Sequence, residues 1–275
     1  MYPRQRLPRA VVRTAVVLGA ALVATTPTLE AQIAPTQIDS SSGEVARNRP
    51  TIRTRFIVAP YGWMSGIKGE TGVRDLSADV DVSFGDLLDN LKFAAMGTFE
   101  VGYDRWLGVI DAMYTSVQID RTASLGPGQQ DLTAKTKMLI AEAFGGYSIV
   151  PASDLVVDIL AGARIWSVEA SLNVAGSNAS AERSRNPTWT DAVIGARLRW
   201  AAAQRWDVSA GGDGGGGGPR GSKGTAQAYA TAGYDLSELW QVFGSYRYLY
   251  LNYARNEYFF KGHLGGPLIG VAYRW

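Results

Sequence analysis

A period of two in residue character runs through most of this sequence, and this alternation restricts the fold more than any other feature. In the segment 93–103, Phe93, Phe99 and Tyr103 occupy one face while Glu100 falls on the other. Successive side chains of a β-strand point to opposite sides, so such segments are predicted to be strands with one apolar and one polar face. Beyond the first fifty residues no segment keeps a helical period for long. The pattern predicts an all-β protein.

Tyr and Trp flank the short breaks between these segments. Tyr103 and Trp106 enclose one break, Trp200 and Trp206 enclose another, and Tyr234 precedes a third. These side chains favour the level of lipid headgroups, where an apolar ring meets water at one edge. A soluble barrel has no reason to place aromatic residues at one level in turn after turn. We therefore expect an antiparallel transmembrane β-barrel.

Composition narrows the chemistry that the chain can carry. The 275 residues include no cysteine and a single histidine, His263. A disulfide scaffold, a thiolate metal site and a catalytic thiol are therefore excluded, as is any metal site that needs two imidazoles. With 46% hydrophobic and 19% charged residues, the sequence is too apolar for disorder and too mixed for a helical membrane bundle. We expect no metal and no cofactor.

The first residues are typical of a cleaved secretory signal peptide, with arginines ahead of the short apolar run Ala15–Ala24. This leader contains four arginines and one acidic residue. Removing it from 27 basic and 25 acidic residues leaves 23 basic and 24 acidic ones, so the chain's basic excess is no argument for nucleic acid binding. We divide the chain into a signal peptide (1–31), a flexible periplasmic tail (32–51) and an outer-membrane barrel domain (52–275).

Connection lengths predict the topology. Four connections are short: near 104–105, 151–154, 202–204 and 235–238. Four are longer and polar or glycine-rich: 120–131, 173–187, 213–222 and 254–262. The two kinds alternate, as in barrels with short periplasmic turns and longer outer loops.

The strand 93–103 leads into the first short connection, and one further strand, at about 53–63, comes before it. The segment 65–91 is then a single outer excursion, with an extended stretch at 78–84 and a helical turn at 86–91. The total is ten strands, an even number as such barrels require, with eight or twelve as alternatives.

The end of the chain forms an alternating apolar strand that closes on an aromatic residue. Such an end resembles the assembly signal of outer-membrane barrels. The residues assigned to this signal are Ile269, Val271, Tyr273 and Trp275.

The polar faces of the strands predict which charged side chains enter the lumen. A narrow interior makes isolated charges costly, so these residues are expected to pair with one another or to meet water. The lumen residues are Glu100, Asp111, Glu142, Asp158, Arg164, Asp191, Arg197, Arg199, Asp207, Asp213, Arg247 and Arg274. Complete pairing favours a structural barrel, and incomplete pairing favours a narrow, charge-selective pore.

Two other functions compete with this interpretation. His263 lies near the outer end of the last predicted strand, so a hydrolase at the outer rim is one alternative. It requires an acid and a nucleophile close to the imidazole, and no motif supplies them. An adhesive or ligand-binding surface on the outer loops is the other alternative. The sequence favours a barrel that is not an enzyme.

Several motifs along 52–275 share one pattern. They are Pro60-Tyr61-Gly62-Trp63, Asp79–Leu91, Ala161-Gly162-Ala163-Arg164, Gly211–Gly215, Tyr246-Arg247-Tyr248-Leu249 and Gly266-Pro267-Leu268-Ile269-Gly270. Together they resemble a widespread family of uncharacterised Gram-negative outer-membrane barrels. The chain departs from that pattern at the glycine run 214–218 and Pro219. The resemblance implies a fold and a location in the outer membrane, and it implies no activity or ligand.

The expected partners follow from this location. They are outer-membrane lipid, lipopolysaccharide and the barrel-assembly machinery, without nucleic acid. Oligomeric state, conduction, any solute or surface ligand, and the conformation of Gly211 to Gly218 are left open by the sequence.

Overall fold

The computed structural model describes residues 5–6, 54–73, 76–124, 129–151, 154–176, 180–218, 220–255 and 258–275. The signal peptide expected at 1–31 and the tail expected at 32–51 lie outside the described residues, apart from Gln5 and Arg6. These two residues form β1 (Gln5–Arg6), which pairs in parallel with β4.

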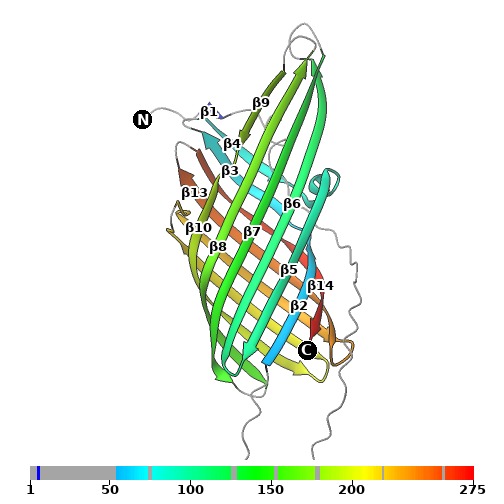
Figure 1. Ribbon diagram of the computed structural model, residues 1–275, viewed down its shortest axis with the longest axis vertical. Helices are drawn as coiled ribbons and strands as arrows, with labels where there is room; N and C mark the ends of the chain where they lie inside the picture. Colours follow the sequence, from blue (N-terminus) through cyan, green and yellow to red (C-terminus); the bar gives the residue numbers. More distant parts are fainter. Residues whose placement is uncertain are drawn as a thin grey trace, which may run out of the picture.

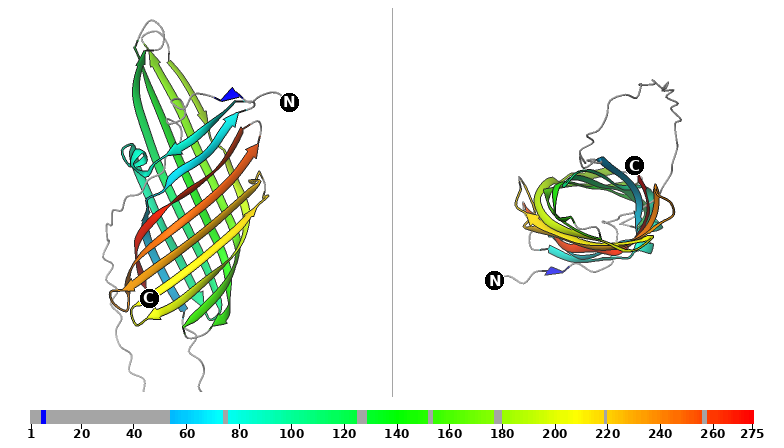
Figure 2. Two further views of the ribbon diagram at one scale, coloured as in Figure 1. Left: turned by 180° about the vertical axis from the view of Figure 1, so that it is seen from behind. Right: turned by 90° about the horizontal axis from the view of Figure 1, so that it is seen from below.

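Ten strands form a closed antiparallel barrel, as the sequence predicts (Figures 1 and 2). They are β2 (Thr54–Trp63), β5 (Leu91–Tyr103), β6 (Trp106–Ser124), β7 (Gln129–Pro151), β8 (Leu155–Gly176), β10 (Thr188–Ala203), β11 (Trp206–Gly216), β12 (Gly224–Asp235), β13 (Trp240–Arg255) and β14 (Tyr258–Arg274). The last strand, β14, pairs with the first, β2, and this contact closes the ring. Figure 2 shows the ring from below.

Short turns join strands at one end of the barrel, which we call the short-turn end. They follow β5, β7, β10 and β12, at the four positions predicted from sequence. The opposite end, which we call the hairpin end, carries the longer excursions. In Figure 1 the short-turn end is at the bottom, and the C-terminus lies there.

The predicted excursion 65–91 is a hairpin followed by a helical turn. β3 (Gly66–Val73) pairs with the part of β14 that β2 does not reach, and β4 (Leu76–Val82) pairs with β3. The helix α1 (Phe84–Leu88) follows. It begins there because the Ser83 hydroxyl accepts a hydrogen bond from the Asp86 amide while the Asp86 carboxylate accepts one from the Ser83 amide.

The other long connections are shorter than the sequence suggests. β6 and β7 extend into 120–131, and β13 and β14 extend into 254–262. β8 runs to Gly176, and β9 (Ser180–Arg185) pairs with it inside 173–187. Beyond a membrane both faces of a hairpin meet water, so its polar composition looks like that of a loop even though its backbone is paired.

The glycine-rich segment also continues a strand. Residues 211–216 belong to β11; all of them pair with β10, and 211–215 also pair with β12. The turn begins at Gly216 and Gly217, whose φ angles of 143° and 72° favour glycine. This segment is therefore part of the barrel wall up to the turn.

The outer wall of the barrel is apolar and carries aromatic pairs at the short-turn end. Trp106 packs on Tyr147 and Trp206 on Tyr234, with ring centroids 4.9 and 5.0 Å apart. Each of these pairs joins neighbouring strands beside a short turn, as expected for a belt at the headgroup level. In the described part of the chain, no helix is long and apolar enough to cross a membrane.

Candidate functional site: the barrel interior

The structure places all twelve sequence-predicted lumen charges on the inner side of the wall. Within the described residues, eleven of them form ion pairs with one another or with Arg55 and Asp235. The twelfth, Asp191, forms no ion pair with a described residue. The charges are arranged in layers that follow the barrel axis.

A central layer is organised by two arginines from opposite sides of the barrel. Arg247 of β13 contacts Asp111 at 3.0 Å and Glu142 at 3.2 Å. Arg164 of β8 contacts the same Glu142 and also Asp213, each at 2.7 Å. Each guanidinium therefore bridges two carboxylates, and Glu142 links the two arginines. Charge-assisted bonds of this kind favour one fixed geometry.

Neutral side chains complete the central layer. The Tyr61 hydroxyl lies 3.0 Å from Asp111 and from Arg247, and the Thr98 hydroxyl donates to Asp111 at 2.6 Å. Gln227 accepts from Arg247 at 2.6 Å and donates to both Glu142 and Asp213. These uncharged residues were not predicted from sequence, although the alternation of their strands places Tyr61 and Gln227 on the inward-pointing face.

A second layer lies nearer the short-turn end. Arg197 contacts Glu100 at 2.7 Å and Asp158 at 3.0 Å, and Arg199 contacts the same Asp158. Arg55, which the sequence analysis did not select, contacts Glu100 at 2.8 Å. This layer therefore holds three guanidinium groups and two carboxylates.

A third layer lies at the short-turn end itself. Arg274 contacts Asp207 at 2.9 Å and Asp235 at 3.2 Å. The Gln241 amide donates to both of these carboxylates. Neither Asp235 nor Gln241 was selected from sequence, because Asp235 was assigned to the short connection 235–238 and Gln241 carries no charge.

Asp191 has a different environment. Its carboxylate is fully buried and, among the described residues, accepts one hydrogen bond, from the Ser222 amide at 2.6 Å. That bond ties β10 to the connection that follows the glycine-rich end of β11. Asp191 therefore holds a turn in place and takes no part in the charge layers.

Toward the hairpin end the interior changes from charged to apolar. Trp166, Trp189 and Tyr253 stack on one another, with ring centroids 5.7 and 4.1 Å apart. Trp63 and Leu249 lie in the same cluster, and the exposed fractions of Trp63, Trp166 and Leu249 are 1%, 1% and 0%. We call this cluster the apolar plug.

The plug was not expected from sequence, although a signal for it exists. On β7, for example, Ile140 and Met138 continue the inner face beyond Glu142. The inner face of several strands thus becomes apolar toward the hairpin end. From the sequence we expected that face to be polar along its whole length.

Solvent exposure of the charged side chains falls with distance from the short-turn end. The Asp207 side chain is 37% exposed, that of Arg197 is 13% exposed, and that of Arg164 is 0% exposed. Water therefore reaches the interior from the short-turn end, whereas the side chains of the plug are almost fully buried.

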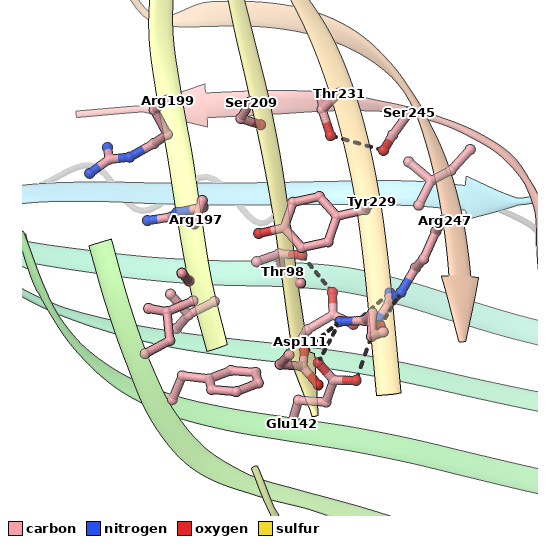
Figure 3. A pocket seen from close by; sticks show the side chains of 18 of the residues that line it. Thr98, Asp111, Glu142, Arg197, Arg199, Ser209, Tyr229, Thr231, Ser245 and Arg247 are labelled. Carbon is pink, nitrogen blue, oxygen red and sulfur yellow. Dashed lines mark hydrogen bonds and ion pairs between the residues drawn. The ribbon is translucent and has the colours of Figure 1, made fainter. Parts of the chain in front are cut away.

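A cavity of about 210 Å³ lies between the central and second layers (Figure 3). Asp111, Glu142 and Arg247 line one part of it, and Arg197 and Arg199 line another. Among the described residues, no three His, Asp or Glu side chains come together as a metal-binding group.

His263 lies on the outer side of β14, away from the lumen. Its ring stacks on Tyr248, with the ring centroids 4.9 Å apart. In register it pairs with Tyr250 on one side and Lys68 on the other. Within the described part of the chain, no acid or hydroxyl is hydrogen-bonded to the imidazole.

No family model matches the sequence, and no curated protein matches it. Solved structures do match the fold. The outer membrane protease OmpT from Escherichia coli aligns over 82% of this chain and 98% of its own, with a TM-score of 0.51 and 10% identity. The chain has an outer-membrane β-barrel fold. The translocator domain of the autotransporter NalP from Neisseria meningitidis aligns over 83% of this chain and 90% of its own, with a TM-score of 0.42 and 15% identity.

Proposed function

We propose that this outer-membrane barrel is a structural protein whose lumen does not conduct. The observation that carries the proposal is the apolar plug, which fills the interior across the hairpin end. The paired charges below it support the same conclusion, because a hydrated pore leaves charges free to meet ions. Burying ionic groups requires that each be paired and hydrogen-bonded, and the central layer meets that requirement.

The proposal includes a location and an orientation. The chain is exported through the signal peptide 1–31 and inserts in the outer membrane of a Gram-negative cell, with the help of the barrel-assembly machinery. The short-turn end faces the periplasm and the hairpin end faces outward, where lipopolysaccharide surrounds it. The girdle of aromatic pairs and the alternation of turn lengths support this orientation.

The proposal assigns no catalytic role to the chain. OmpT is a protease, but the likeness to it is a likeness of fold, and fold does not carry function. The outward position of His263, stacked on Tyr248, supports the same view. An adhesive role of the outer hairpins is the remaining alternative, and much of that surface lies outside the described residues.

Single-channel recording of the purified barrel in a planar bilayer tests the proposal. We expect no conductance steps from the natural chain. The double variant Trp166→Ala/Trp189→Ala removes two stacked rings of the plug and should produce conductance steps. The matched control is Trp200→Ala, which removes a half-exposed Trp from the outer wall and should leave the barrel silent.

The narrow-pore alternative gives a different recording. Steps from the natural chain, with an ion selectivity that Arg247→Ala changes, would establish the narrow pore and refute the closed barrel. Each Trp→Ala change in a core costs about 3–5 kcal/mol, so folding of the double variant is checked by its heat-modifiable migration before recording.

A further inference from the structure

Two rows of inward-facing residues cross four neighbouring strands at the cavity. One row consists of Arg199, Ser209, Thr231 and Ser245, which are direct neighbours in register from β10 to β13. It combines one guanidinium with three hydroxyl groups. Figure 3 shows these four side chains side by side along one edge of the cavity.

The adjacent row brings a phenol to the same place. In register, Arg197 faces Gly211, and Gly211 faces Tyr229. A Cβ atom added at Gly211 would lie 2.6 Å from the Tyr229 hydroxyl, so the ring lies over the glycine and reaches toward β10. In Figure 3 the hydroxyl points to the side on which Arg197 lies. The absence of a side chain at Gly211 therefore positions this hydroxyl.

Three side chains at the cavity, Arg199, Ser209 and Tyr229, have a donor that forms no hydrogen bond with a described residue. Arg199 gives its Nε and one terminal nitrogen to Asp158 and retains its other terminal nitrogen. The hydroxyls of Ser209 and Tyr229 make no hydrogen bond with a described residue. By contrast, the acids that line the cavity, Asp111 among them, already accept hydrogen bonds.

Local charge favours the same kind of ligand. The second layer, to which Arg197 and Arg199 belong, has three guanidinium groups and two carboxylates, whereas the central layer at the other end of the cavity has two guanidinium groups and three carboxylates. The positive charge is therefore concentrated at the Arg199 end, where spare donors favour the charged group of an anion.

The opposite wall of the cavity is apolar. Phe144 and Leu160 belong to a buried cluster, and Val109 packs against it and also lines the cavity. At about 30 Å³ for each water molecule, the volume of 210 Å³ corresponds to roughly seven waters. This space suits a short organic molecule with one charged end.

We propose that the cavity binds a small amphipathic anion, a short-chain carboxylate, which enters from the short-turn end. Its carboxylate accepts hydrogen bonds from Arg199, Ser209 and Tyr229, and its alkyl chain packs against Phe144 and Leu160. This binding needs no movement of the apolar plug and does not depend on whether the lumen conducts.

Isothermal titration of the purified, folded barrel with hexanoate tests the proposal. We expect saturable binding of one hexanoate per barrel. The neutral analogue hexanamide has the same chain and should bind at least ten-fold more weakly. Tyr229→Phe and Ser209→Ala each remove one donor without disturbing an ion pair, and each should weaken hexanoate binding by about three- to ten-fold, the usual range for one hydrogen bond.

Tyr246→Phe is the matched control, because Tyr246 lies on the outer wall of the barrel and is 58% exposed. It should bind hexanoate as the natural chain does. The proposal fails if the natural chain shows no saturable binding, if hexanamide binds as tightly as hexanoate, or if both Tyr229→Phe and Ser209→Ala leave the affinity unchanged. The last outcome would mean adventitious partition into detergent or protein.

Discussion

Arg247 joins the charged interior to the apolar plug. Its guanidinium contacts Asp111, Glu142 and the Tyr61 hydroxyl on one side. The ring of Trp63 lies on another side, 5.3 Å from the guanidinium carbon. A planar group with several donors satisfies these neighbours together, whereas the compact ammonium of lysine does not.

Replacing Arg247 by Ala should lower the temperature of the heat-modifiable transition of the barrel by several degrees. The change leaves Asp111 and Glu142 short of a cation, and breaking a buried pair costs about 3–5 kcal/mol. Arg247→Lys should fall between Ala and the natural residue. Migration on gels after stepwise heating measures the transition.

Arg205→Ala provides the control, because Arg205 is exposed in a short turn and should not affect the transition. An unchanged transition temperature in Arg247→Ala would contradict the structural role of the central layer.

The last strand is the element on which closure depends. β14 pairs with β13 along one edge, and its other edge is shared between β2 and β3. Its end is fixed by two backbone hydrogen bonds between Phe56 and Trp275, of 3.0 and 3.1 Å. The two rings also stack, with centroids 5.4 Å apart. Trp275 therefore sits at the point where the first and last strands of the barrel meet.

Trp275→Asp should lower the amount of folded barrel in the outer membrane by about ten-fold or more. The substitution removes the ring contact with Phe56 and puts a charge at the lipid-facing end of the strand, where charge is unfavourable. Trp275→Phe keeps an aromatic ring and should restore most of the level. Heat-modifiable migration of membrane fractions gives the amount, and a normal level for Trp275→Asp would contradict the assembly role proposed for the C-terminal strand.

The molecule as a whole has two unlike ends. The short-turn end admits water to the charge layers, while the hairpin end is closed by the plug and extended by β3, β4 and β9. The sequence contains no cysteine, so a single introduced thiol can report which end faces the cell exterior. Lys223 at the hairpin end and Glu238 at the short-turn end are both exposed and suit this purpose.

On intact cells, a bulky maleimide that does not cross the outer membrane should label Lys223→Cys and not Glu238→Cys. After the outer membrane is permeabilised, both should be labelled to a similar extent. The reverse pattern on intact cells would invert the proposed orientation.

Much of the architecture could be predicted from sequence alone, because a membrane barrel imposes one repeated rule on every strand. Alternation with a period of two, aromatic residues beside short turns and an even strand number led to ten strands, and this number is confirmed. The same alternation grouped the charges from Glu100 to Arg274 on one face of their strands, and the aromatic residues beside the turns indicated that this face points into the lumen. The helical turn predicted at 86–91 is present but lies slightly earlier, at Phe84–Leu88, because Leu91 already belongs to β5.

The tertiary structure decided which inward-facing residues meet, and where the polar interior ends. Glu142 and Arg164 are direct neighbours in register. Arg247, by contrast, contacts Glu142 across the lumen, and no pattern within a single strand predicts that contact. The apolar plug likewise depends on several strands, β2, β8, β10 and β13 among them, whose inner faces become apolar at the same height. Alternation is a property of one strand, whereas pairing across the lumen and closure of the interior depend on the register of all ten strands.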